Sequence, residues 1–188
     1  TGVQTCALPI SKSSLGEQTT PASLTIVDAS ASASSVAFSD LDLDAGDLGG
    51  ASTWSAPADA SLVANYVVYL AEDATGTNKA EVGTKAVGTN ALGVALDTAK
   101  SSHTHVLVFT KSSLGEQTTP ASVSIVDKSA SASSVAFTDL DLDAGDLGGT
   151  STWSAPVDAS LVANYVVYLA DDAAGANKAE LGTKAVGR

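Results

Sequence analysis

The chain contains one long segment twice. Residues 12–89 recur as residues 111–188 at an offset of 99 positions, and only eleven of the 78 aligned positions differ. A period of about 100 residues is too long for a solenoid unit, which needs its neighbours to fold, and it matches the size of a self-sufficient β-sandwich. The repetition therefore predicts a tandem array of one independently folding domain.

The apolar residues of one full period, residues 34–132, predict strands. They alternate in short runs between clusters of Gly, Pro, Asp, Asn and Ser, and no segment has a sustained helical period. Seven short strands in about 100 residues is the number expected of a two-sheet sandwich. The expected strands lie near Val36–Phe38, Thr53–Trp54, Tyr66–Leu70, Val82–Val87, Leu92–Leu96, Val106–Phe109 and Val123–Val126.

Three stretches of the period resemble the fibronectin type III family. Trp54-Ser55-Ala56-Pro57 resembles the Trp-x-x-Pro that ends the family's second strand, and residues 63–69 resemble its third strand. Residues 110–121 resemble the final turn into the last strand, whereas His105 stands where the family carries its corner tyrosine. The resemblance implies an all-β fold of tandem immunoglobulin-like or fibronectin type III-like antiparallel β-sandwiches, located outside the cell or at its surface.

This pattern divides the chain into four parts. Residues 12–33 are the expected last strand of a preceding repeat with its linker, residues 34–132 a complete repeat, and residues 133–188 a truncated repeat with an exposed sheet edge and core. Residues 1–11 have no counterpart in the later copy, resemble a translated sequencing adapter, and are expected to be a disordered artefact. We therefore expect a fragment whose only cysteine, Cys6, lies outside the repeats.

Charge argues against two classes of partner. The chain has 21 acidic and nine basic residues, which gives a formal net charge of −12. Nucleic acids and anionic membranes both require clusters of Lys and Arg, so we expect neither as a partner of this segment. The acidic composition instead favours solubility and the binding of cations.

The most distinctive motif is an acidic stretch, residues 40–50, which recurs intact as residues 139–149. Asp occupies every second position before a turn with Gly, and such a stretch can wrap a calcium ion, which takes six to eight oxygen ligands. The stretch is not a helix-loop-helix calcium loop, because Gly46 comes one place late and Ala51 stands where that loop carries Glu. The candidate ligands of a calcium site of another type are Asp40, Asp42, Asp44, Asp47, Asp139, Asp141, Asp143 and Asp146.

A second interpretation makes the same stretch an edge strand and turn. The Asp side chains then face water, Leu41, Leu43 and Leu48 face the core, and the charge discourages pairing at the edge. Phe38 shares the parity of the Asp residues, so this interpretation requires a β-bulge near Ser39. Both interpretations stay open at the level of the sequence.

The family topology would add further carboxylates to the acidic stretch. It implies that the loop after the first strand lies at the same pole as Glu72, Asp73 and Asp97, and that this pole faces the next repeat. Asp127, in the linker, would join them. Calcium at this pole would neutralise carboxylates that repel one another and stiffen the joint between repeats.

Other residues predict little chemistry. His103 and His105 would share one face of a strand and form a transition-metal pair, but two ligands are too few, so we favour one packed and one rim histidine. His105 is expected to face partly inward and to need a hydroxyl or backbone partner. The sequence has no Gly-x-Ser-x-Gly elbow and no phosphate-binding glycine pattern, so we do not expect an enzyme.

These observations together predict a non-catalytic, extracellular repeat array that serves as a structural spacer or adhesive stalk in cell adhesion. Its partners are neighbouring repeats of the same protein, and calcium at the joints is its one candidate ion. The alternative is a multivalent module that binds carbohydrate or protein through an exposed face carrying Tyr69 and Val67.

Overall fold

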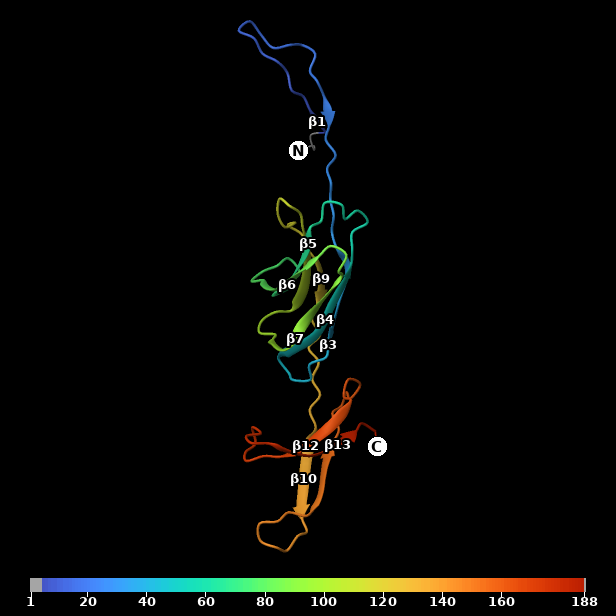
Figure 1. Ribbon diagram of the computed structural model, residues 1–188, viewed down its shortest axis with the longest axis vertical. Coiled ribbons are helices and arrows are strands. Elements are labelled where there is room, and N and C mark those ends of the chain that lie inside the picture. The colour runs from blue at the N-terminus through green and yellow to red at the C-terminus, as the bar shows by residue number, and fades with distance from the viewer. Residues whose placement is uncertain (1–4, 188) are drawn as a thin grey trace. The chain divides into compact units, whose positions relative to one another are not determined.

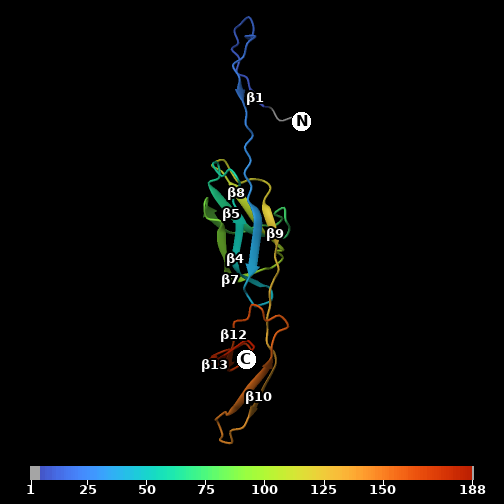
Figure 2. The same ribbon diagram turned by 90° about the vertical axis from the view of Figure 1, so that its right-hand side faces the viewer.

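The computed structural model describes residues 5–187, which contain β-strands and no helix. Figures 1 and 2 show the strands, all of which pair antiparallel. The chain divides into two compact units, Thr1–Ala31 and Ser32–Arg188. The all-β class predicted from the sequence is therefore confirmed. Among the described residues there is no apolar helix of membrane-spanning length.

The complete repeat contains the seven strands that the sequence predicts, with somewhat different boundaries. They form a three-stranded sheet in the order β3-β4-β7 and a four-stranded sheet in the order β6-β5-β8-β9. The strands are β3 (Ser34–Asp40), β4 (Asp47–Ser55), β5 (Asn65–Ala71), β6 (Ala80–Ala86), β7 (Ala91–Ala99), β8 (His105–Lys111) and β9 (Ala121–Ser124).

The two sheets pack face to face through alternate residues of their strands. Trp54 of β4 meets Tyr66 of β5 edge to face, with 5.3 Å between ring centroids. Period-2 alternation places Val68 and Leu70 on the same face as Tyr66, and all three side chains are buried. The arrangement is consistent with the β-sandwich class.

The β-bulge expected near Ser39 is not there. Ser39 and Asp40 pair regularly with Ala51 and Gly50, and the register of β3 against β4 instead shifts between Ser34 and Ala37. The strand ends at Asp40, so the residues that follow do not alternate, and no bulge is required to place them.

The later copy forms the same first four strands but leaves them open. Strands β10 (Ser133–Asp139) and β11 (Gly149–Ser154) make one two-stranded sheet, and β12 (Asn164–Leu169) and β13 (Ala179–Ala185) make another. Trp153 and Tyr165 keep the ring contact of the complete repeat, at 5.4 Å, but are only partly buried. No strand of the described chain takes the places of β7, β8 and β9 here, and several apolar side chains of these four strands are exposed.

The unit that ends at Ala31 holds a short hairpin. Strand β1 (Cys6–Ala7) pairs with β2 (Leu24–Thr25), and Cys6 lies opposite Thr25 as His105 lies opposite Ser124 in the complete repeat. Cys6 and Ala7 thus form a two-residue strand within the segment that was expected to be a disordered artefact, and that expectation stays a prediction. For residues 1–4 that expectation lies outside the described residues.

We predict that Trp54→Ala lowers the free energy of unfolding by about 3–5 kcal/mol, because it empties a buried site between two closed sheets. Trp153→Ala is the matched control, and its only partly buried side chain, which no second closed sheet covers, predicts a smaller loss of about 1 kcal/mol. Urea unfolding followed by circular dichroism measures both. Equal losses in the two variants would contradict the difference in packing between the copies.

Candidate functional site

The acidic stretch forms a tight loop, residues 41–46, between β3 and β4. Gly50 has a φ of 146°, and a Cβ there would lie 2.2 Å from the carbonyl oxygen of Ser39. A Cβ on Gly49 would lie 3.2 Å from Leu96. The glycine pair therefore lets the start of β4 lie close against β3 and β7, which is a structural reason for two adjacent glycines.

The Asp40 carboxylate organises the loop and the linker that follows β9. Its Oδ1 accepts hydrogen bonds from the amides of Asp42, at 3.2 Å, and Gly49, at 2.9 Å. Its Oδ2 accepts a third hydrogen bond from the amide of Lys128, at 2.9 Å. Asp40 is 5% exposed, and these three amides supply the donors that a buried carboxylate needs.

Three carboxylates meet beside this loop. One oxygen each from Asp42, Asp44 and Asp97 lies within 4.8 Å of the other two. Asp42 is buried, with Oδ1 accepting from the amide of Asp44 at 3.0 Å and Oδ2 from the amide of Asp97 at 2.9 Å. These hydrogen bonds, that from the Asp44 amide first, lower the pKa of Asp42 and outweigh its desolvation.

Asp97 joins the group because β7 is irregular there. Its φ of 59° lies in the left-handed region, next to the register shift that separates the Leu48–Thr98 and Gly50–Val94 pairs. The sequence placed Asp97 at this pole but not among the candidate ligands. The signal that could have identified Asp97 is its position beside Leu96. Exposed and buried residues alternate at the start of β7, but Leu96, which should be buried, is exposed.

The loop does not follow the solvated edge-strand interpretation. Asp40 and Asp42 are buried, Leu41 is 58% exposed, and only Leu48 of the three leucines is fully buried. The physical reason is that the chain turns at Leu41 rather than continuing as a strand, so alternation no longer decides which side chain faces inward.

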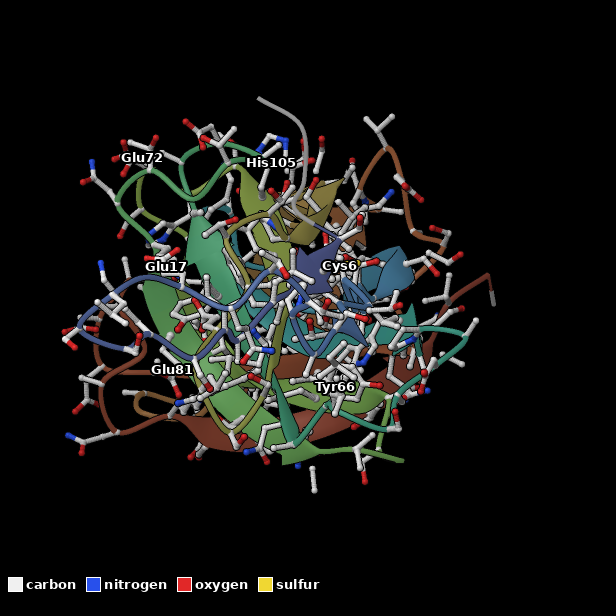
Figure 3. All side chains as sticks on the ribbon, turned by 90° about the horizontal axis from the view of Figure 1, so that it is seen from above. Cys6, Glu17, Tyr66, Glu72, Glu81 and His105 are labelled. Carbon is white, nitrogen blue, oxygen red and sulfur yellow. The ribbon has the colours of Figure 1, made fainter. Side chains whose placement is uncertain are left out.

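The other carboxylates predicted at this pole do not belong to the three-carboxylate group, and two of them accept hydrogen bonds from nearby residues. Asp47 lies outside the three-carboxylate group. Glu72, labelled in Figure 3, accepts hydrogen bonds from Asn78 at 2.9 Å and Ser102 at 2.7 Å. The side chain of Asp73 caps its own loop, accepting from the amides and hydroxyls of residues 75–77, and these bonds, that from the Thr77 hydroxyl first, hold its pKa well below the usual value.

The later copy repeats the local geometry of the loop. Asp139 accepts from the amides of Asp141, at 3.0 Å, and Gly148, at 2.9 Å, and Asp141 accepts from the amide of Asp143 at 2.9 Å. Asp146 likewise closes its turn, donating its amide to the carbonyl of Asp143. Within the described residues these four aspartates belong to no such group of carboxylates.

The two histidines do not form a metal pair with other ligands among the described residues. His105, labelled in Figure 3, has Thr104 Oγ1 2.7 Å from Nδ1 and Ser124 Oγ 3.3 Å from Nε2, so the expected hydroxyl partner is present. His105 lies on the same face of β8 as Leu107 and Phe109, and this face points away from the three-stranded sheet. The expectation that His105 faces partly inward is therefore wrong. His103 lies before β8, in a loop.

The proposed ligand face of the four-stranded sheet is covered. Val67 is buried, and the hydroxyl of Tyr69 donates to Glu116 at 2.8 Å. The Nζ of Lys79 lies 4.1 Å from the centre of the Tyr69 ring and 3.9 Å from that of Phe109, and it pairs with Glu116 at 2.5 Å. Burial first, and then the carboxylate of Glu116, raise the pKa of Tyr69 to about 12.

Comparison with protein-family models, with curated proteins and with solved structures gives no match for this chain. The class that the observations support is an all-β protein with a repeated segment, in which an acidic loop joins the first two strands of each copy.

We predict that calcium binds the complete repeat at one ion per chain, through Asp42, Asp44 and Asp97, with a dissociation constant of about 10⁻⁴ to 10⁻³ M. Asp97→Asn should abolish the binding heat in calorimetry, because it removes one carboxylate ligand. The main-chain amide of residue 97 stays, so its hydrogen bond to the Asp42 carboxylate is kept. Asp141→Asn in the open copy is the matched control and should change nothing. If the unmodified chain gave no heat at millimolar calcium, the prediction would be wrong, and these aspartates would serve only to hold the conformation of the loop.

A second prediction concerns alkaline pH. The pKa of Tyr69 is about 12 in the folded chain and about 10 when unfolded, so folding favours the neutral hydroxyl. This contribution is complete below about pH 10 and is lost as pH rises towards about 12. In Tyr69→Phe the free energy of unfolding, measured with urea, should fall less between about pH 9 and about pH 11. A fall as steep as in the unmodified chain would contradict the assignment.

Proposed function

We propose that this chain is part of a non-catalytic, fibronectin type III-like repeat array that acts outside the cell as a spacer or adhesive stalk. The seven strands in two antiparallel sheets support the sandwich, and the repeated segment supports the array. Repetition is itself useful in a spacer or in multivalent display, which favours these roles over catalysis.

The observation that carries the proposal is the attachment of the linker to the acidic loop. The amide of Lys128 donates to Asp40, and the amide of Ala130 donates to the carbonyl of Leu43 at 3.1 Å. The carboxylate of Asp127 accepts from the amide of Gly46 at 3.2 Å and lies 3.5 Å from the Nζ of Lys100. Four contacts thus hold the first linker residues against the repeat that they leave.

A held linker is what a spacer requires. A Ser- and Ala-rich linker without such contacts is a flexible coil, and the distance that it spans then fluctuates widely. Here the carboxylates fix the linker at the end of the sandwich, and a calcium ion on Asp42, Asp44 and Asp97 would stiffen the loop that holds it. The same acidic residues would therefore serve each joint of the array.

The alternative, a multivalent module for carbohydrate or protein, has one structural feature in its favour. Leu114 stands at the apex of the hairpin after β8 and is 99% exposed, as its counterpart Leu15 is at 98%. The amide of Ser112 donates to the carbonyl of Gly115 at 2.9 Å, and Ser13 does the same to Gly16. An ordered turn that presents one leucine fits an apolar pocket of a protein better than it fits carbohydrate, and the test is whether Leu114→Ser loses binding to a candidate protein.

We predict that Asp40→Ala speeds hydrogen exchange at the amide of Lys128 by roughly ten-fold or more, because it removes a charged acceptor. Asp139→Ala is the matched control, since Asp139 caps the same loop in the open copy. Residue-resolved exchange by nuclear magnetic resonance measures both. A Lys128 amide that already exchanges at the rate of an unstructured peptide would overturn the held joint.

A further inference from the structure

The outer face of the four-stranded sheet carries a second buried cluster, separate from the core between the two sheets. Ala71, Leu107 and Phe109 are each at most 3% exposed, and Tyr69 packs against them. Strand pairing places Tyr69 opposite Leu107 and Val67 opposite Phe109, so these side chains share the face that points away from the three-stranded sheet. An apolar cluster on an outer face stays out of water only if another segment covers it.

The loop between β5 and β6, residues 72–79, provides this cover. A Cβ on Gly76 would lie 3.8 Å from the Cζ of Phe109 and 3.6 Å from the Cδ of Lys79, so the loop is in contact with the cluster. The carboxylate of Asp73 caps the loop from within and fixes its main chain. Lys79 therefore extends over the cluster from a fixed position at the end of the loop.

The ammonium group of Lys79 fills a site bounded by two aromatic rings and a carboxylate. Its Nζ lies 4.1 Å from the centre of the Tyr69 ring and 3.9 Å from that of Phe109. The same Nζ lies 2.5 Å from Oε1 of Glu116, whose Oε2 accepts a hydrogen bond from the Tyr69 hydroxyl at 2.8 Å. Ring faces and a fixed carboxylate are the groups that bind an ammonium ion in proteins, so the lysine shows which chemistry the site accepts.

A second carboxylate strengthens the preference for a cation. Glu81 of β6, labelled in Figure 3, lies directly opposite Tyr69 in the sheet. Its charge contributes to the raised pKa of Tyr69, after burial and the hydrogen bond and charge of Glu116. The chain as a whole has a formal net charge of −12. A ligand that carries an anionic group next to its ammonium would be repelled here, whereas a cationic side chain would be attracted.

Lys79 is an exchangeable occupant of this site. Its side chain is 32% exposed and flexible, so the ammonium can rotate into water without a change in the loop. A ligand can enter only while the lysine is out, and its apparent affinity is reduced by the fraction of molecules that are open. The lysine–tyrosine contact recurs in the later copy, where the Nζ of Lys178 lies 4.8 Å from the centre of the Tyr168 ring. The hairpin of β5 and β6 therefore places the lysine over the tyrosine by itself.

We propose that Tyr69, Phe109 and Glu116 form a binding site for a methylated ammonium group. The side chain of Lys79 closes this site as a built-in competitor. The ligand is a methylated lysine side chain of a partner protein, because it presents a cation on an apolar stem without an anionic group beside it. Such a site does not depend on the spacer role, and it gives the alternative, a multivalent binding module, its class of ligand.

Binding of tetramethylammonium chloride to the full chain tests the site, with sodium chloride at equal ionic strength as the reference. Nuclear magnetic resonance of the main-chain amides of Tyr69 and Phe109 is the readout. Lys79→Ala should bind the ion with a dissociation constant of about 1–10 mM, tighter than the unmodified chain by about ten-fold or more. Lys79→Gln, which keeps part of the apolar stem, should show the same gain. Lys85→Ala is the matched control and should bind like the unmodified chain, because Lys85 lies opposite Tyr66 and so on the other face of the sheet.

Two further comparisons define the ligand. Tyr69→Leu added to Lys79→Ala should abolish the binding, because it removes one ring and the hydroxyl that holds Glu116. The amide of Nε-trimethyllysine should bind more tightly than phosphocholine, whose phosphate the two carboxylates repel. The absence of amide shifts in both Lys79 variants, an equal gain in Lys85→Ala, or binding that survives Tyr69→Leu would overturn the proposal. Tighter binding of phosphocholine would overturn the assignment to a lysine side chain.

Discussion

The fold depends on one constraint, which is that each half of the sandwich needs the other to bury its apolar face. The chain contains the first half twice with almost the same residues, and only one copy meets strands β7, β8 and β9. Tyr66 is fully buried between the sheets, whereas Tyr165, with the same neighbours in sequence, is not. Identical residues thus have different burial because apolar burial is a property of the closed pair of sheets.

The same constraint governs the acidic loop. Its local hydrogen bonds form in both copies, since Asp40 and Asp139 cap amides only two and nine residues away. Its longer-range contacts, with the amides of Asp97 and Lys128, come from the second half of the repeat and from the linker. The loop is therefore built locally, but it contacts β7 and the linker only where the sandwich is complete.

The sequence predicted the strands well because alternation and turn residues are local signals. It predicted the burial of the acidic stretch poorly. The solvated-strand interpretation assumed that alternation continues past Asp40, whereas the chain turns there and Gly49 and Gly50 let it lie against β7. Asp97 was missed as a ligand because its left-handed φ and the register shift of β7 arise from sheet pairing, which no short window of sequence reports. The covered face of Tyr69 depends on Glu116, which lies 47 residues away.

By itself the sequence determined the period of 99 residues, the all-β class, the placement of the strands and the conformation of the short loops. These follow from alternation, glycine positions and hydrogen bonds over a few residues. Only the tertiary structure decided which carboxylates are buried and which aromatic face is covered. These depend on contacts between segments far apart in the chain, whose formation requires a partner strand as well as a suitable local sequence.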